Sequence, residues 1–237
     1  MSGHSKWASI RHKKGAADAK RGKIFSKYAK LITVAAKDGG GDLDSNFSLR
    51  LLVDKAKGAN MPKDNIERAI KRGTGEIAGG ELTGALYEAM GPGGAAILVE
   101  SLTDNTNRAY TNIRTIISKS GANFDAKVLW QFDHKGVVRV DDISKIEDKD
   151  ETELNLIESG AEDIQWEEGL VVICNKGDLQ AVDKVVTESG LVSTSAELEY
   201  VPQNEVQLSE SDEAKLASLI EKLDDDDDVN NVFTNAA

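Results

Sequence analysis

The chain has 237 residues, of which 30% are charged and 5% aromatic, and its formal net charge at pH 7 is −12. Its single cysteine, Cys174, excludes an internal disulfide and a cysteine-based zinc site. No stretch approaches the roughly 18 apolar residues of a membrane span, and the first residues lack the apolar middle of a secretory signal. We therefore expect a cytoplasmic protein.

The charge is unevenly distributed along the chain. Residues 1–75 contain 17 Lys and Arg against 7 Asp and Glu, a balance of +10, whereas residues 76–237 contain 12 against 34, a balance of −22. Such asymmetry indicates a polyanion as the partner of the basic part. The acidic remainder would keep the protein soluble and repel nucleic acid wherever contact is not needed.

Residues 15–37 (GAADAKRGKIFSKYAKLITVAAK) predict a helix with two different faces. At 100° per residue, four lysines share an arc of about 80° and six apolar side chains share another arc of about 120°. One arc can pack on a core while the other presents ammonium groups to phosphate. The four lysines are Lys20, Lys23, Lys27 and Lys30. Further basic residues lie upstream around Trp7, namely Lys6, Arg11, Lys13 and Lys14.

Two shorter helices follow in the basic part. Asp44 or Ser45 is the expected N-cap of a helix that ends at Gly58. Asn60-Met61-Pro62 predicts the start of another helix, which ends at Gly73. On this last helix Arg68, Lys71 and Arg72 lie together on one side. Residues 1–75 thus predict a basic helical nucleic-acid-binding domain, and residues 74–80 predict a linker.

From residue 81 onward the pattern changes to short strands alternating with helices. Strands are expected at 85–90, 95–102 and 127–132, with a helix capped by Asp104 or Asn105 between the last two. The next segment has the order strand, helix, strand, strand, helix, strand. These elements are expected at 137–140, 151–159, 163–167, 170–174, 179–189 and 194–201. A strand at 205–208, a helix at 211–223 and a strand at 229–234 follow.

This order predicts an α+β protein with two ferredoxin-like α/β domains after the helical one. Residues 81–133 and 204–237 would form one discontinuous domain, and residues 134–203 would form an acidic domain inserted into it. Consecutive domains are the alternative, but they would leave the last two strands without a sheet. Because short connections and neighbouring chain ends favour insertion, we prefer the inserted arrangement.

Clustered basic residues supply sequence-independent affinity for phosphate, because they release counterions from nucleic acid. A solvated helix face is the alternative explanation for any isolated run of lysines. Here the basic groups share one unit of balance +10 inside an acidic protein, which favours nucleic-acid binding. The predicted contact residues are Lys6, Arg11, Lys13, Lys14, Lys20, Arg21, Lys23, Lys27, Lys30, Arg68, Lys71 and Arg72. Trp7 suits stacking on a base and packing equally well.

Two loops are candidates for a secondary contact. Gly91-Pro92-Gly93-Gly94 resembles a phosphate cradle loosely, but it lacks the Gly-Lys-Ser/Thr of a Walker loop, so a tight turn explains it too. Asn105 and Arg108 lie at a predicted helix N-terminus, where anions bind readily, although capping accounts for most of this pattern. The secondary-contact residues are Gly91, Gly93, Gly94, Asn105 and Arg108.

The sequence predicts no catalytic site, metal or cofactor. Residues 224–228 are five consecutive aspartates, but they lack the spacing and glycine of an EF-hand, so a solvated acidic turn is the better interpretation. The three histidines are too scattered to form a metal site. No serine-histidine-aspartate set or paired-carboxylate motif stands out, so we expect a protein that is not an enzyme.

Several long motifs resemble those of the YebC/PmpR family. They are GHSKWASIRHKK at 3–14, KIFSKYAKLI at 23–32, ANMPKDNIERAIKRGTGE at 59–76, LYEAMGPGGAAILVESLTDNTNR at 86–108 and VNNVFTNA at 229–236. The resemblance implies a three-domain bacterial or organelle-derived cytoplasmic protein. It implies a DNA-binding transcriptional regulator, or alternatively a ribosome-associated translation factor that relieves stalling or activates particular messages.

The function expected from the sequence is therefore non-enzymatic DNA binding that regulates transcription. Binding of ribosomal RNA is the alternative, because both activities need a basic N-terminal domain. A second alternative is a protein-interaction adaptor, whose basic residues would meet acidic partners. In every case the acidic domains would offer a surface to a protein partner.

Overall fold

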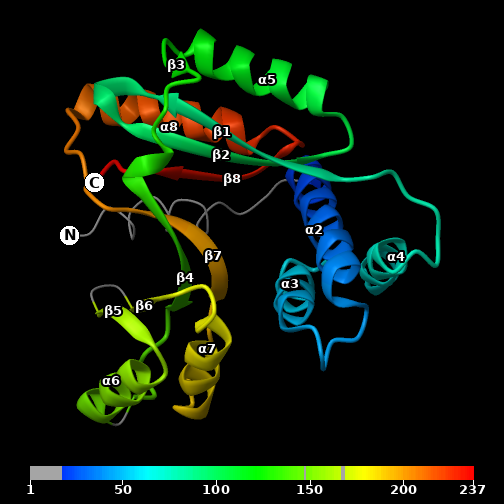
Figure 1. Ribbon diagram of the computed structural model, residues 1–237, viewed down its shortest axis with the longest axis vertical. Coiled ribbons are helices and arrows are strands. Elements are labelled where there is room, and N and C mark those ends of the chain that lie inside the picture. Colours follow the sequence, from blue (N-terminus) through cyan, green and yellow to red (C-terminus); the bar gives the residue numbers. More distant parts are fainter. Residues whose placement is uncertain (1–17, 147, 167–168) are drawn as a thin grey trace. The chain divides into compact units, whose positions relative to one another are not determined.

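The computed structural model describes residues 18–146, 148–166 and 169–237, with side chains described from Arg21 onward. The described chain forms two compact units. Of the described residues, 132–203 form one unit, and residues 18–131 form the other together with residues 204–237. Helices and two four-stranded antiparallel sheets make up these units, which confirms the α+β class and the insertion of one α/β fold into another (Figure 1).

Three helices form the first part of the larger unit: α2 (Asp18–Gly39), α3 (Phe47–Gly58) and α4 (Lys63–Gly73). The apolar faces expected from the sequence meet in one core. Gly73 lets the end of α4 approach α2 closely, because a Cβ at this position would lie 2.3 Å from the carbonyl oxygen of Thr33. The buried residues of this core are Ile32, Ala36, Leu49, Val53, Ala56, Met61, Ile66 and Ala69.

The N-cap of α3 is Asn46, not the predicted Asp44 or Ser45. The Asn46 side chain accepts a hydrogen bond from the Leu49 backbone N–H at 3.0 Å. Its amide group also donates to the carbonyl oxygens of Ala35 and Gly40, at 2.8 Å each. Because one buried side chain bonds both the end of α2 and the start of α3, it fixes the turn between them.

The sheet of the larger unit has the strand order β3-β1-β2-β8, and every neighbouring pair is antiparallel. Central strand β2 is buried at seven of its eight residues, as its continuous apolar run predicts. Helices α5 and α8 pack against each other and cover the same side of the sheet (Figure 1). The elements are β1 (Thr83–Met90), β2 (Ala96–Thr103), α5 (Thr106–Lys119), β3 (Asn123–Phe124), α8 (Glu210–Asp224) and β8 (Val229–Thr234).

The ferredoxin-like strand order arises here from a different set of strands than expected. Strand β1, which precedes the others in sequence, occupies the place that we assigned to residues 205–208. Those residues contribute only an isolated bridge between Val206 and Ala236. The strand predicted at 127–132 is also wrong, since a short 3-10 helix, η2 (Leu129–Gln131), lies there.

Glu88 explains why the chain turns near η2. The Glu88 carboxylate accepts hydrogen bonds from the backbone N–H groups of Val128 and Leu129, at 2.7 and 2.8 Å. Burial alone would raise the pKa of Glu88, but these two bonds and the Lys127 ammonium outweigh it and lower the pKa. A carboxylate that binds two successive amides favours a turn over an extended strand.

The smaller unit has the strand order β5-β6-β4-β7, the ferredoxin-like arrangement predicted from its sequence. Cys174 is fully buried in β6, and burial raises the pKa of its thiol to about 11. Its elements are β4 (Phe132–Val140), α6 (Lys149–Glu158), β5 (Ala161–Gln165), β6 (Leu170–Cys174), α7 (Leu179–Glu188) and β7 (Ser195–Pro202). In the described parts of both units, no helix is long and apolar enough to cross a membrane.

Candidate nucleic-acid interface

Lys20, Lys23, Lys27 and Lys30 on α2 form the α2 lysine row. Two of them, Lys23 and Lys27, which we call the outer lysines, contact the protein's own acidic turn, defined as Asp224–Asp228. The Lys23 ammonium donates to the Asp225 carbonyl oxygen at 2.6 Å. The Lys27 ammonium donates to the Asp224 carbonyl oxygen at 2.5 Å. Both acceptors are backbone oxygens, so these two hydrogen bonds do not involve the aspartate side chains.

The position of the acceptors explains the attraction. Helix α8 ends at Asp224, and the last carbonyl groups of a helix have no N–H donor within it. The helix C-terminus also carries a partial negative charge of roughly half an elementary charge. The ammonium groups of Lys23 and Lys27 therefore cap α8 from a different helix, at a place where a run of carboxylates adds further negative potential.

Lys30 is held more deeply than the outer two lysines. Its ammonium donates to the carbonyl oxygens of Leu102 at 3.1 Å and Asp227 at 2.8 Å, and to Asp228 Oδ1 at 3.0 Å. The Lys30 side chain is 20% exposed and that of Asp228 only 2%. With three acceptors around it, this ammonium is occupied inside the protein and does not project as a phosphate contact.

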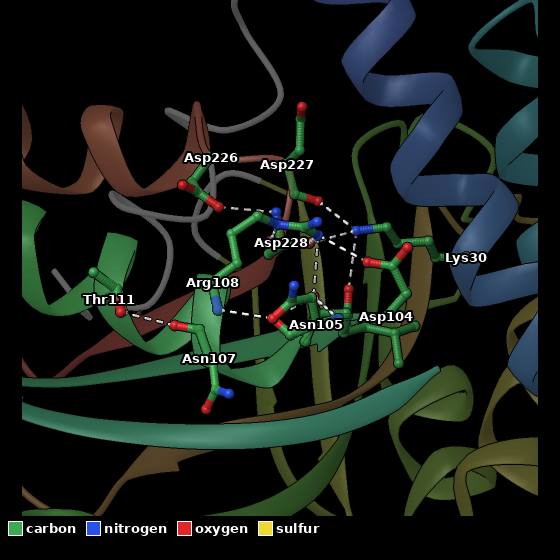
Figure 2. A network of polar contacts seen from close by, with 11 residues as sticks. Lys30, Asp104, Asn105, Asn107, Arg108, Thr111, Asp226, Asp227 and Asp228 are labelled. Carbon is green, nitrogen blue, oxygen red and sulfur yellow. Dashed lines mark hydrogen bonds and ion pairs between the residues drawn. The ribbon is translucent and has the colours of Figure 1, made fainter. Parts of the chain in front are cut away.

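Arg108 completes the network from the start of α5, as Figure 2 shows. Its Nε and Nη2 atoms donate to Asp228 Oδ2 at 2.8 Å and Oδ1 at 2.9 Å, and Nη2 also donates to Asp104 Oδ1 at 2.9 Å. Burial would raise the pKa of Asp228, but Arg108 and Lys30 outweigh it and lower the pKa to about 2. Asp228 is therefore a fully ionised, buried anchor that joins α2, α5 and the acidic turn.

This network corrects the interpretation of residues 224–228 as a solvated turn. Asp225 and Asp227 are exposed as expected, but Asp228 is buried and paired with two cations. An unpaired carboxylate would be costly at that position, so the two cations are what allows its burial. Within the described parts of the chain, no group of His, Cys, Asp and Glu side chains is arranged to hold a metal ion.

The basic residues of α4 are placed differently from those of α2. Arg68, Lys71 and Arg72, which we call the α4 basic face, are all exposed on the last turns of the helix. Among the described residues, none forms an ion pair or hydrogen bond with these three side chains. Three cations within five residues on one helix face form a local positive surface that is available to an anion.

The glycine turn packs as structure and does not form an open cradle. Gly93 has a positive φ of 64°, and a Cβ there would lie 2.6 Å from the Leu208 side chain, so the turn fits closely against the residues that lead into α8. A Cβ on Gly91 would meet the Ile97 side chain at 2.7 Å. Gly94 also has a positive φ, of 81°. These contacts explain the glycines by turn geometry.

The other two secondary-contact residues also have structural partners. The Asn105 side chain accepts from the Arg108 backbone N–H at 3.0 Å and is the N-cap of α5. The Arg108 guanidinium is bound by Asp228 and Asp104, which raise its pKa. Both residues thus hold the network together in this structure.

The remaining predicted contact residues fall into three groups. Arg21 is exposed on α2 and already has an interaction partner. Lys20 lies in the first turns of α2, but its side chain falls outside the described part of the structure. Four others, Lys6, Arg11, Lys13 and Lys14, lie outside the described residues altogether.

Sequence reasoning missed the role of Asp228 and its partners. Nothing within a run of five aspartates marks one of them as buried. Its position could have indicated burial. Asp228 directly precedes Val229, the buried first residue of strand β8, and a residue next to a buried strand end lies close to the core.

Two protein-family models together match nearly the whole chain. The model described as the TACO1/YebC protein N-terminal domain matches residues 5–76, and the model described as the TACO1/YebC second and third domain matches residues 82–236. The chain belongs to the TACO1/YebC family. The α2 lysine row lies in the first matched region and the acidic turn in the second, so their contact joins the two matched regions of this chain.

Individual relatives agree with this assignment. A probable transcriptional regulatory protein of Desulforapulum autotrophicum is 48% identical over 240 residues, covering 100% of this chain and 96% of the relative. One of Maridesulfovibrio salexigens is 49% identical over 239 residues, covering 100% and 95%. The crystal structure of a conserved hypothetical protein from Aquifex aeolicus has a TM-score of 0.86 and 37% identity, covering 98% of this chain and 97% of that one. The TACO1/YebC fold thus extends over the full described chain.

Proposed function

We propose that this protein is a non-enzymatic, DNA-binding regulator of transcription that acts in the cytoplasm. The observation that supports this most directly is the α4 basic face, where Arg68, Lys71 and Arg72 are exposed and without ion-pair partners in the described chain. The relatives that are named probable transcriptional regulatory proteins support the regulatory role.

The chemistry of the α4 basic face suits the phosphate backbone. Arginine presents a planar fork of donors that matches phosphate oxygens, and lysine adds a compact positive charge. Contacts of this kind position a protein on nucleic acid without reading its sequence. In the proposal, residues 1–75 form the binding domain, and the α4 basic face makes contacts alongside Lys6, Arg11, Lys13, Lys14, Lys20 and Arg21. Lys23 and Lys27 join them only where the acidic turn releases them, whereas Lys30 stays bound to Asp228 and its neighbours.

The acidic parts of the chain have a separate role in this proposal. Residues 81–133 and 204–237 form the domain that carries the acidic turn, and residues 134–203 form the inserted domain. The inserted domain repels phosphate and so restricts binding to the helical domain. It also leaves an acidic surface for a protein partner.

The direct test is to identify nucleic acid that is crosslinked to the protein in cells. We expect DNA fragments enriched upstream of particular genes, and a labelled fragment of that kind should outcompete bulk DNA at physiological salt. Recovery of ribosomal RNA, with co-sedimentation on ribosomes and equal competition by all DNA, would replace this proposal with a role in translation. Recovery of no nucleic acid would favour a protein-interaction adaptor.

A further inference from the structure

The contact between the α2 lysine row and the acidic turn places nucleic acid and the protein in competition for the same cations. Lys23 and Lys27 were predicted to bind phosphate, yet in this structure they bind the carbonyl oxygens of Asp225 and Asp224. A lysine ammonium that caps α8 is withheld from an incoming phosphate. The protein in this form therefore offers fewer cations than its sequence contains.

We propose that the acidic turn is an internal competitor of nucleic acid: binding opens the outer contacts at Lys23 and Lys27, while the inner contact at Lys30 stays closed. This inference rests on the proposed function, because it requires that the helical domain binds a polyanion. It adds a regulatory device to that function, since strengthening or weakening the outer contacts changes affinity.

The difference between outer and inner contacts follows from their surroundings. The Lys23 contact lies at an exposed position and the Lys27 contact at a partly buried one, and both acceptors are backbone oxygens at the end of α8. Lys30 instead has three acceptors, one of them the carboxylate of Asp228, which Arg108 also binds. Removing Lys30 would leave a buried charge with one partner fewer, which is costly. The outer contacts therefore open at lower cost than the inner one.

A phosphate can replace the helix terminus at the outer positions. The end of a helix offers roughly half a negative charge, whereas each phosphate offers a full one, and binding also releases counterions. The neighbouring carboxylates of Asp225 and Asp227 are exposed, so they repel a phosphate that approaches while the turn is in place. Binding and opening are thus linked, and each promotes the other.

The test is to lock the outer contact with a covalent bridge. A Lys23→Cys, Asp225→Cys variant of the full chain is treated with a short bismaleimide, and the control is the same variant capped with N-ethylmaleimide. The native Cys174 is fully buried with a raised pKa, so it does not react in the folded protein. Binding of duplex DNA is measured by fluorescence anisotropy in both forms.

We expect the bridged form to bind about tenfold more weakly than the capped form, and with a smaller dependence on salt, because Lys27 is withheld. Equal affinity of the two forms would overturn the competition while leaving the proposed function intact. If neither form nor the unmodified chain binds nucleic acid, the proposed function fails and the competition fails with it.

A second measurement needs no substitution and guards against a variant that folds poorly. Amide hydrogen exchange is followed in the unmodified chain with and without saturating duplex DNA. We expect the amide groups at the end of α8 and in the acidic turn to exchange faster on binding. Without the lysines bound to its carbonyl oxygens, this segment opens more often. Exchange in the buried strand β2 serves as the internal reference. Unchanged or slower exchange at residues 224–228 would contradict the inference.

Discussion

Asp228 shows how much of this structure depends on one buried charge. Its carboxylate is 2% exposed and is bound by Lys30 from α2 and by Arg108 from α5. A buried ion pair adds little net stability over apolar packing, but removing the carboxylate leaves the largely buried Lys30 ammonium without its charged partner. The network therefore fixes the position of α2 relative to α5 and the acidic turn.

Asp228→Asn should lower the free energy of unfolding by about 3–5 kcal/mol, because two cations lose the carboxylate between them. The matched control is Asp227→Asn, one residue earlier, where the side chain is exposed and the change should stay within about 0.5 kcal/mol. Urea denaturation of both variants measures the difference. Equal effects of the two substitutions would show that Asp228 is not the anchor.

The same residue predicts a specific dependence of stability on pH. The pKa of Asp228 falls from 3.8 to about 2 in the folded protein, so the folded state binds fewer protons than the unfolded state between these values. The pH-dependent part of the stability that ionised Asp228 supplies is about 2 kcal/mol. It is present above about pH 4 and is lost as the pH falls through about 2. The difference in unfolding free energy between the unmodified chain and Asp228→Asn should therefore shrink over that range. A difference that stays constant from pH 6 to pH 2 would contradict it.

At the scale of elements, sequence patterns predicted most of the helices and strands but not all of their partners. The strand at 229–234 and the end of α4 at Gly73 agree with the structure, because a buried apolar run and a terminal glycine are local signals. The strand expected at 127–132 failed because Glu88, some 40 residues away, binds that backbone. A long-range hydrogen bond of this kind leaves no mark on the local pattern.

The cap of α3 offers a direct test at this scale. Asn46→Ala should destabilise the protein by about 2 kcal/mol, since the side chain bonds the start of α3 and two carbonyl groups near the end of α2. Asp44→Ala removes the cap expected from sequence and should change the stability by less than about 0.5 kcal/mol. Thermal or urea unfolding of the two variants distinguishes them. A larger loss of stability from Asp44→Ala than from Asn46→Ala would show that Asn46 is not the cap of α3.

For the molecule as a whole, the net charge of −12 resides in the inserted residues 132–203, which contain 6 Lys and Arg against 18 Asp and Glu. The rest of the chain is neutral overall, with its positive charge concentrated before residue 76. Nucleic-acid binding by such a molecule has to be local, because only a small surface attracts phosphate. It should also weaken steeply with salt.

The candidate site was only partly predictable at this scale. The sequence correctly indicated which residues share a helix face, as with Arg68, Lys71 and Arg72. It could not indicate what each face meets in the fold. The α2 lysine row and the α4 basic face look alike in periodicity, yet Lys23 and Lys27 of the first cap α8 and the second is exposed. A helical pattern defines a surface, and tertiary structure decides whether that surface is already occupied.

The most direct test of the nucleic-acid interface is the salt dependence of duplex DNA binding after charge reversal on α4. A triple variant, Arg68→Glu, Lys71→Glu and Arg72→Glu, is compared with Lys145→Glu, Lys176→Glu and Lys184→Glu. The second triple changes the net charge equally, at exposed positions of the inserted unit. The α4 triple should bind at least about a hundredfold more weakly, and its plot of log affinity against log salt should be shallower by about 3. The inserted-unit triple should keep the slope of the unmodified chain. Equal loss and equal slopes in the two triples would contradict a phosphate-binding role for α4.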